Sequence, residues 1–416
     1  LEDNGVYDIV LQAGEIADTG GRFNRRIIIG SFEVAIAFAG QIDVTTTADG
    51  ITAGTLRAAV QAANAEAGLN TIVLRTGETY ILNIAGAGED AAATGDLDII
   101  DPAGLIIRGN GATIRIIGGI DRVFDLQAGG SLTLLDVTIA GGVTNSDGGG
   151  VRNSGGTLTV ERSLLTGNTA SSGGALASTG TTTLINTTIS GNDATNGAGI
   201  EHTAGTLLLS SVTVTDNAVT ATGGGIRSTA NAQLQNTIVA GNTAATSNPD
   251  ASGTFASNGH NLIGIVGAAT GLTDGSNGDQ VGSSGSPIDP LLGVLKNNSG
   301  FTFTHRLLPG SPAIDAGDNA LAPSVDQRNI TRPIDANRTR TPTVDIGAHE
   351  RNLVDIQGTK FLDANSNGVR DSGEPGLAGW TIYLDLNNNG QLDSAEPSTV
   401  TGQTGRALRV IYGREV

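Results

Sequence analysis

Apolar and polar residues alternate in short stretches through the middle of the chain. TLTV at residues 157–160 and TTIS at residues 187–190 are two examples. A period of two predicts strands with one buried face, each about three to five residues long. None of these stretches has the 3.6-residue period of an amphipathic helix. The middle of the chain is therefore predicted to consist of many short β-strands.

The alternating stretches recur at a nearly constant interval. A slot that usually reads Gly-Asn ends at Asn168, Asn192, Asn217 and Asn242, so successive slots lie about 25 residues apart, and Gly142 fills the slot one repeat earlier. Aliphatic residues occupy two fixed positions before the slot: Ile139, Leu165, Ile189, Val214 and Val239, and further upstream Leu134, Val160, Leu184, Leu209 and Leu234. Every repeat thus offers apolar side chains at the same phase.

Glycine-rich clusters mark a second recurring position. They stand at residues 148–150, 173–174, 197–199 and 223–225. Glycine allows close backbone approach and unusual φ values, as a repeated corner requires. Short strands, glycine corners and a period of about 25 residues predict a parallel β-solenoid whose coils cover one another. We expect the four asparagines of the slot to stack as a structural ladder rather than to bind a ligand.

One upstream segment has helical spacing. Leu56, Ala59, Val60 and Ala63 would share one helix face, which predicts a helix that caps the open end of the solenoid. The surrounding segment, VTTTADGITAGTLRAAVQAANAEAGLNTIVLRTGETYIL at residues 44–82, resembles the N-terminal module of bacterial surface proteins named for a Cys-Ser-Leu-Arg-Glu-Ala motif (CSLREA). The motif reads Gly-Thr-Leu-Arg-Ala-Ala here and lacks the Cys and the Glu.

Several blocks downstream of the repeats occur in order. THRLLPGSPAIDAGD at residues 304–318, DQR at 326–328, RP at 332–333 and DIGAHE at 345–350 resemble the region that closes β-helix proteins of the choice-of-anchor type. With these flanks, the repeats resemble right-handed parallel β-helix proteins of bacterial surfaces. The resemblance implies an all-β, right-handed β-helix that ends in irregular closing coils.

The sequence pattern changes at residue 356. Residues 363–374 and 385–396 both fit D-x-N-x-N-G-x-x-D-x-x-E, which is the ligand spacing of a calcium loop. Side-chain oxygens stand at positions 1, 3, 5, 9 and 12, glycine permits the turn at position 6, and position 7 offers its carbonyl. The predicted metal ligands are Asp363, Asn365, Asn367, Val369, Asp371, Glu374, Asp385, Asn387, Asn389, Gln391, Asp393 and Glu396.

These loops follow predicted strands instead of helices. GTKF at residues 358–361 and WTIYL at 380–384 read as strands, and Pro follows each position-12 Glu, so a helix-pair calcium sensor is not expected. We expect structural calcium that contributes folding free energy, with plain Asx-rich turns as the alternative. The segment resembles the first half of the calcium-binding B-type domains of serine-aspartate repeat adhesins, small β-sandwiches related to collagen-adhesin B modules. The final TVTGQTGRALRVIYGREV does not match the rest of such a domain, so we expect a truncated or divergent C-terminus.

Composition excludes several classes of protein. The net charge of −18 argues against binding to phosphate backbones, so nucleic acid is not an expected partner. The absence of cysteine excludes disulfides and thiolate metal sites. No apolar run is long enough to predict a membrane span. Glycine, at 62 of 416 residues, is about twice its usual share, and aromatics at 3% are scarce, which suits thin stacked β layers.

The first 40 residues allow two interpretations. Residues 25–39 combine two arginines, an apolar run and an Ala-Phe-Ala end, as a secretory signal does. Glu33 interrupts the run, so we favour a strand over residues 34–38. Because the chain starts at Leu1 and contains no Met, we expect a fragment or a processed form.

The β-helix fold also occurs in pectate lyases and polygalacturonases, so fold alone leaves an enzyme open. Acidic residues in the regular coils are few: Asp136, Asp147, Glu161, Asp193, Glu201 and Asp216. We interpret Arg152 and Arg227 as solvated surface charge, and His305 and His349 as satisfied structural histidines. Threonine rows such as residues 181–183 are not expected to keep a constant phase, which disfavours an ice- or carbohydrate-binding face. No catalytic residue is predicted.

The predicted organisation has five parts. They are an N-terminal extension (1–40), a cap with the first coils (41–128), regular coils (129–265), irregular closing coils (266–350) and a partial B-type calcium-binding β module (356–416). The favoured function is a non-catalytic, secreted or cell-surface, adhesin-like scaffold, a monomer whose partners are surface or matrix glycans or proteins. The alternative is a polysaccharide lyase or glycoside hydrolase of the pectin-degrading β-helix type.

Overall fold

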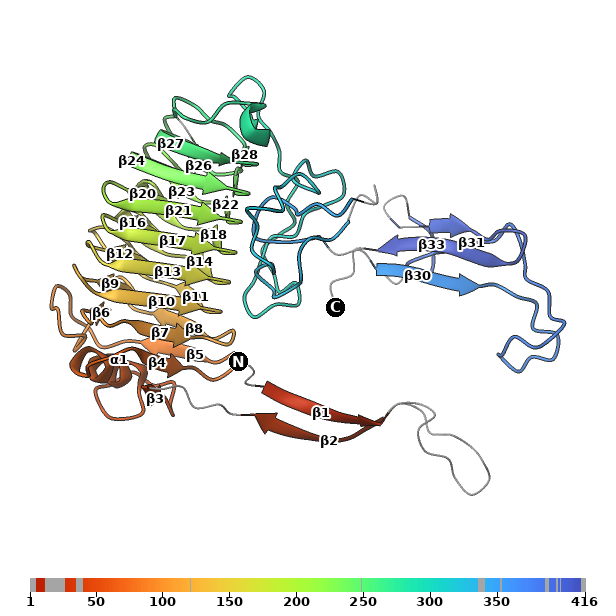
Figure 1. Cartoon of the computed structure of the whole chain (residues 1–416), viewed down its shortest axis with the longest axis horizontal. Helices are drawn as coiled ribbons and strands as arrows, with labels where there is room; N and C mark the ends of the chain where they lie inside the picture. Colours follow the sequence, from red (N-terminus) through yellow and green to blue (C-terminus); the bar gives the residue numbers. More distant parts are fainter. Residues whose placement is uncertain are drawn as a thin grey trace.

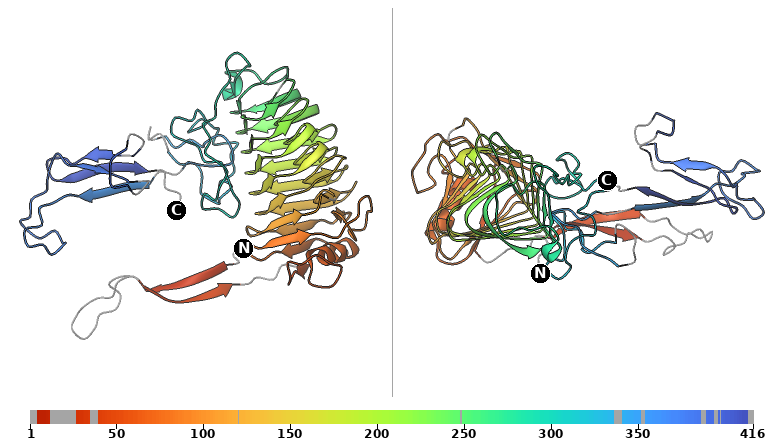
Figure 2. Two further views of the ribbon diagram at one scale, coloured as in Figure 1. Left: turned by 180° about the vertical axis from the view of Figure 1, so that it is seen from behind. Right: turned by 90° about the horizontal axis from the view of Figure 1, so that it is seen from above.

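The chain folds into a stack of parallel β-coils with one helix near the N-terminal end of the stack (Figure 1). The computed structural model describes residues 5–11, 27–34, 40–119, 121–247, 249–335, 341–351, 354–385, 389–393, 396 and 398–412. Seen along the stack, the coils have a roughly triangular outline (Figure 2). The predicted all-β solenoid, with its repeat of about 25 residues, is confirmed, because Thr181 pairs in parallel with Thr206 on the next coil.

Each coil contributes strands to three faces, and each face is a parallel sheet. Face 1 consists of β3 (Gln41–Asp43), β4 (Asn70–Val73), β7 (Leu105–Arg108), β10 (Ser131–Leu135), β13 (Thr157–Glu161), β17 (Thr181–Ile185), β21 (Thr206–Ser210) and the second half of β24 (Ile226–Gln235). Face 2 consists of β5 (Thr79–Leu82), β8 (Thr113–Ile116), β11 (Thr138–Ala140), β14 (Leu164–Thr166), β18 (Thr188–Ser190), β22 (Thr213–Thr215), β25 (Ile238–Val239), β28 (Leu262–Ile263) and β29 (Gln280–Val281).

Face 3 follows face 2 along each coil. It consists of β6 (Leu97–Ile99), β9 (Phe124–Leu126), β12 (Val151–Asn153), β16 (Leu176–Ser178), β20 (Ile200–His202) and the first halves of β24 and β27 (Ala251–Gly259). The second half of β27 pairs with β24 on face 1. A short sheet between faces 2 and 3 consists of β15 (Thr169–Ser172), β19 (Asp193–Asn196), β23 (Ala218–Val219) and β26 (Thr243–Ala244). Successive coils are therefore joined by main-chain hydrogen bonds on every side.

Aliphatic side chains fill the interior of the coils. Both sets of residues at the repeated phase are fully buried, as Leu184 and Ile189 illustrate with 0% exposure. One continuous apolar cluster extends from Val44 to Leu272. Burial of each such side chain stabilises the fold by about 1.5–3 kcal/mol.

Several corners of the coil use left-handed backbone. At the corner before face 3, Gly148, Gly173, Gly197 and Gly223 have φ values of 71°, 66°, 53° and 73°, which confirms the predicted role of the glycine clusters. At the corner between faces 1 and 2 the left-handed residue is not glycine. The residues there, with φ values from 46° to 55°, are Asp136, Arg162, Asn186, Ser211, Asn236 and His260.

The coils differ slightly in length, so some residues that align in the structure do not recur at a constant interval in the sequence. One row of threonines aligns Thr133 with Thr159 and Thr159 with Thr183, although the first of these steps along the chain is longer than the second. Another row, of exposed threonines, runs in register through Thr157, Thr181 and Thr206. The expectation that threonine rows do not keep a constant phase is therefore wrong over three coils of face 1.

The predicted helix is α1 (Leu56–Ala65), and the side chain of Thr55 caps its N-terminus by accepting from the N–H of Ala58. Its four predicted face residues are buried. Asn64 on this helix donates to the carbonyl of Asp98 at 2.7 Å, which fixes α1 against the first strand of face 3. The helix therefore covers the N-terminal end of the stack, as expected (Figure 1).

Residues 286–335 and 341–350 pack beside face 2 instead of continuing the coils. Gln327 donates to the carbonyl of Ser163 at 3.1 Å and accepts from Thr188 Oγ1 at 2.6 Å. Ala348 N donates to Thr213 Oγ1 at 3.0 Å. The region that resembles closing coils thus covers the flank of the solenoid after a short 3₁₀ turn, η1 (Ser276–Gly278).

The two ends of the chain form small antiparallel sheets. β1 (Gly5–Leu11) pairs with β2 (Ile27–Val34), so a strand lies earlier than predicted, and residues 35–38 of the predicted strand lie outside the described residues. β30 (Val354–Thr359) pairs with β33 (Arg406–Tyr412), and β31 (Thr381–Tyr383) pairs with β32 (Ser398–Val400). Among the described residues, no helix has the length and apolarity that a membrane crossing requires.

Candidate functional site

The first predicted calcium loop folds around Asp363. Its Oδ1 and Oδ2 accept from the main-chain N–H groups of Asn367 at 3.1 Å and Gly368 at 2.8 Å. Gly368 has a φ of 76°, so the turn uses the glycine predicted at position 6. The side-chain amides of Asn365 and Asn367 both donate to Oδ2 of Asp371 at 2.7 Å. The polar side chains of positions 1, 3, 5 and 9 therefore converge.

Glu374 closes this loop. Its Oε1 accepts from the N–H of Ala364 at 2.8 Å and its Oε2 accepts from the N–H of Asp371 at 3.0 Å. The residue is only 9% exposed, which is low for a glutamate in a surface loop. Each carboxylate oxygen keeps a second lone pair that could face a cation.

The second loop repeats these contacts. Asp385 accepts from the N–H groups of Asn389 at 3.0 Å and Gly390 at 2.7 Å. Asn389 Nδ2 donates to Asp393 Oδ2 at 2.8 Å, and the N–H of Asp393 donates to Glu396 Oε2 at 3.1 Å. Because unrelated turns have no reason to share four such contacts, the two loops are structural copies.

Three predicted ligands are less defined. Asn387 lies outside the described residues. Val369 and Gln391, which would offer their carbonyls, donate their N–H groups to Oδ1 of Asn367 and Asn389 at 2.7 Å each. The side chain of Val369 is 61% exposed, so only its main chain belongs to the loop interior.

The oxygen-rich donor set of both loops suits Ca²⁺, which prefers carboxylate, amide and main-chain oxygens. The amide nitrogens now face Asp371 and Asp393, and rotation of each amide by half a turn would present oxygen instead. Calcium binding by these residues stays a prediction.

A second cluster of charged residues lies on face 3. The middle residues of its strands stack in parallel register and form a row that we call the ionic column: Asp98, Asp125, Arg152, Ala177, Glu201 and Arg227. Arg152 Nε donates to Asp125 Oδ1 at 2.8 Å, and its Nη2 contacts Oδ2, so the pair is bidentate. Arg227 Nη1 donates to Glu201 Oε1.

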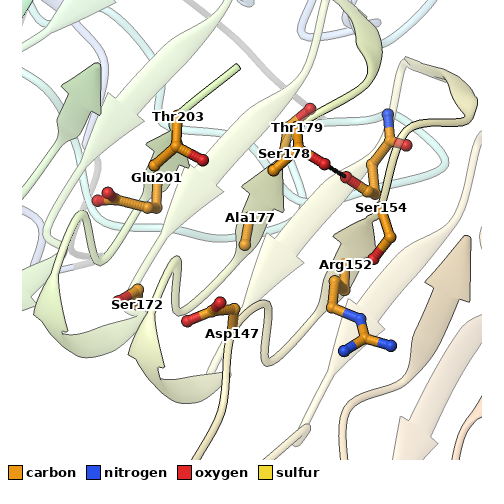
Figure 3. A pocket seen from close by; sticks show the side chains of 10 residues that line it. Asp147, Arg152, Ser154, Ser172, Ala177, Ser178, Thr179, Glu201 and Thr203 are labelled. Carbon is orange, nitrogen blue, oxygen red and sulfur yellow. Dashed lines mark hydrogen bonds between the residues drawn. The ribbon is translucent and has the colours of Figure 1, made fainter. Parts of the chain in front are cut away.

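A groove of about 210 Å³ opens where Ala177 interrupts the ionic column. Figure 3 shows Asp147, Arg152 and Glu201 around it, with the Arg152 guanidinium directed away from Glu201. The other lining side chains, which are mostly hydroxylic, are Asn153, Ser154, Ser172, Ser178, Thr179 and Thr203. The groove is smaller than most drug-sized ligand pockets and is lined for hydrogen bonding.

Burial dominates the electrostatics of this groove. It raises the pKa of Glu201, while the neighbouring Arg227 guanidinium opposes the rise and Asp147 adds to it. Glu201 Oε2 is buried and accepts no hydrogen bond from the described residues. The hydrogen bonds from Arg152 to Asp125 raise the pKa of that guanidinium, so it stays charged.

The interpretation of Arg152 and Arg227 as solvated surface charge is wrong. Their side chains are only 31% and 33% exposed, and both bind buried carboxylates. A weak signal was present in the sequence, because Arg152, Glu201 and Arg227 each stand two residues after the last glycine of a cluster. Only the strand register shows that they form one row with Asp125.

The two histidines within residues 304–350, His305 and His349, are buried. His305 Nδ1 lies 2.8 Å from the carbonyl of Gly293 and its Nε2 lies 2.9 Å from Ser190 Oγ, so it is a satisfied structural histidine, as predicted. His349 is 2% exposed. Because Ser190 is itself 2% exposed, the contact with His305 fixes the flank and offers no accessible nucleophile.

The asparagine slot is a ladder, as predicted. Nδ2 of Asn168, Asn192 and Asn217 each donates to Oδ1 of the asparagine on the next coil at 2.8–3.0 Å. Nδ2 of Asn242 donates at 2.9 Å to Asp250, which ends the row. The row is buried and fully engaged, so it leaves nothing for a ligand.

Comparison with protein-family models, curated proteins and solved structures gives no match to this chain.

Proposed function

We propose that this protein is a non-catalytic scaffold of the secreted or cell-surface kind, in which the solenoid is a rigid spacer and calcium stabilises the C-terminal module. The observation that carries the proposal is the uninterrupted pairing of coils along face 2, from β5 to β29. A solenoid in which every coil contacts only its neighbours transmits force along its axis through these hydrogen bonds. Such a body holds what is attached to its ends at a fixed separation.

Side-chain chemistry supports the same function. The asparagine ladder joins successive coils, and two ion pairs of the ionic column, Arg152–Asp125 and Arg227–Glu201, each join two neighbouring coils. Arg152 and Arg227 are bound to carboxylates of the same face. Both arginines of the column are therefore engaged in stabilising the rod.

Calcium would act as a staple in the C-terminal module. The described sheets there have two strands each, and such small sheets are marginal without additional support. Ca²⁺ held by the two copied loops would neutralise their carboxylates and supply folding free energy. This role also fits an extracellular location, where the calcium concentration is high enough to occupy sites of modest affinity. Surface proteolysis of intact cells that produce the protein tests the location.

The alternative is a polysaccharide lyase or hydrolase, and the groove at Ala177 favours it. Two carboxylates, Asp147 and Glu201, line that groove together with Arg152. A hydrolase requires two carboxyl groups of which one carries a proton, and the raised pKa of Glu201 fits that role. The ion pair between Glu201 and Arg227 opposes it, because the pair keeps the carboxylate charged.

One assay separates the two functions. The purified chain is incubated with polygalacturonate, with and without added calcium, and unsaturated products and new reducing ends are measured. The scaffold proposal predicts no product above that of a Glu201→Gln variant. Turnover that Glu201→Gln abolishes would refute the scaffold and establish the enzyme.

A further inference from the structure

Three buried aspartates meet at the N-terminal end of face 3. Asp96 immediately precedes β6, Asp98 lies within it, and Asp125 lies on the adjacent β9. An oxygen of each carboxylate lies within 4.8 Å of an oxygen of the other two. Their exposed fractions are 2%, 0% and 2%, so water does not screen their mutual repulsion.

Two oxygens at this cluster have no hydrogen-bond donor among the described residues. Asp98 Oδ2 accepts from the N–H of Ala92 at 2.8 Å, but its Oδ1 is buried without a donor. Asp121 is 3% exposed, and its Oδ2 is likewise buried without a donor. That oxygen lies 2.9 Å from the position a Cβ of Gly95 would occupy, next to Asp96. A buried acceptor without a donor costs about 1–3 kcal/mol, which indicates a missing partner.

The charges of the cluster do not balance. Four carboxylates, with Asp121 included, face two guanidinium groups. Arg122 Nη1 lies 2.9 Å from Asp96, 3.3 Å from Asp125 and 3.6 Å from Asp121, and Arg152 binds Asp125. The nearby Arg57 is not a third partner, because it pairs with Asp49 at 2.8 Å. With every carboxylate ionised, two negative charges remain buried without a partner.

The strand register adds to the electrostatic repulsion within the cluster. Asp98 and Asp125 are direct neighbours on paired parallel strands, where like charges destabilise the sheet. Either protons or a cation must therefore compensate the cluster in the folded protein.

We propose that Asp96, Asp98 and Asp125, with Asp121 beside them, hold one hard divalent cation of the Ca²⁺ and Mg²⁺ class. Carboxylate oxygens without nitrogen or sulfur ligands select this class of ion. A divalent ion removes both uncompensated charges and gives Asp98 Oδ1 a partner, whereas one proton removes a single charge. Because the residues are buried, the ion enters during folding and stabilises the first coils next to α1. This site is separate from the two C-terminal loops and does not depend on them.

Native mass spectrometry of the full chain tests this site. The chain carries Glu374→Gln and Glu396→Gln to weaken the loop sites, and it is refolded with CaCl₂ and then exchanged into calcium-free buffer. One bound calcium is expected to remain, to be lost when Asp98→Asn is added, and to be kept with Asp90→Asn, an exposed neighbour. A chain that retains no ion, or whose ion survives Asp98→Asn, would overturn the proposal.

Diffraction covers the case in which Asp98→Asn does not fold. Crystals of the unmutated chain grown with MnCl₂ are expected to show an anomalous peak between the three carboxylates. No peak there would mean that protons compensate the charges, and the proposal would fail. Peaks at the C-terminal loops are scored separately, so failure at one location is distinguishable from failure at the other.

Discussion

Asn192 donates through Nδ2 to Oδ1 of Asn217 at 2.8 Å, across the boundary between two coils. The main-chain N–H of Asn192 donates to the same oxygen at 3.1 Å. Asn217 in turn donates to the carbonyls of Ile189 and Thr215. One buried amide therefore engages groups on its own coil and on its neighbours, and the ladder is part of the hydrogen bonding that holds coils together.

We expect Asn217→Ala to lower the free energy of unfolding by about 3 kcal/mol, because it leaves two buried donors of Asn192 without an acceptor. Equilibrium denaturation in urea measures the change. The matched control is Thr206→Ala, which shortens an exposed strand residue and should change stability by less than about 0.5 kcal/mol. Equal effects of the two substitutions would show that the ladder does not stabilise the stack.

The ionic column makes a prediction about coupling. Arg227→Ala leaves the Glu201 carboxylate buried without its guanidinium and should cost about 1–3 kcal/mol. Glu201→Ala in the same chain removes this unpaired carboxylate. The double variant should therefore be more stable than the sum of the two single losses predicts. Denaturation of all four chains of this cycle gives the coupling energy. Additive losses would mean that the pair makes no net contribution.

The ladder could be predicted from the sequence because its asparagines recur beside a fixed aliphatic pattern. The ionic column is only weakly marked in the sequence, because its residues change from Asp to Arg to Ala to Glu and no residue type recurs at its position. The threonine rows were missed for another reason. Coils of unequal length shift Thr133, Thr159 and Thr183 out of phase with a constant period, while strand pairing keeps them aligned.

Long-range docking is also invisible in the sequence. Thr188 and Gln327 are 139 residues apart, and no local pattern places residue 327 against face 2. The calcium loops are the opposite case. Their spacing alone located Asp363, Asn365, Asn367 and Asp371, which the structure brings together, because a loop of this length fixes its own geometry.

Removal of calcium should expose the C-terminal module to protease. We expect 1 mM EDTA to increase the rate of cleavage within residues 354–412 at least about 10-fold, because a ligand that binds only the folded state stabilises it. Glu374→Gln and Glu396→Gln should each reduce the protection that calcium gives, while Glu66→Gln, on the exposed end of α1, should not. Cleavage rates come from mass spectrometry of the fragments. Calcium-independent cleavage of the unmutated chain would leave the loops as simple turns.

Acid should weaken the attachment of the flank to face 2 through His305. Burial lowers the pKa of His305 below its usual 6.5, against the opposing effects of the Gly293 carbonyl and of Asp216, whose carboxylate lies 3.8 Å from Nε2 but is 64% exposed. The unfolded chain therefore takes up a proton at higher pH than the folded chain. The stability that neutral His305 contributes is present above pH 6.5 and is lost as pH falls below it, with a slope of at most about 1.4 kcal/mol per pH unit.

His305→Asn should remove this part of the pH dependence. The asparagine side chain does not titrate. The free energy of unfolding of the His305→Asn variant should therefore fall less between pH 7.5 and pH 5.0 than that of the unmutated chain. Ser190→Ala is the control, because it removes the hydroxyl partner of Nε2 but keeps the imidazole, and it should retain the full slope at lower stability. His202, whose pKa burial also lowers, is present in all three chains and cancels in the comparison. Denaturation at the two pH values measures each slope, and equal slopes for the unmutated chain and His305→Asn would exclude His305 as the source.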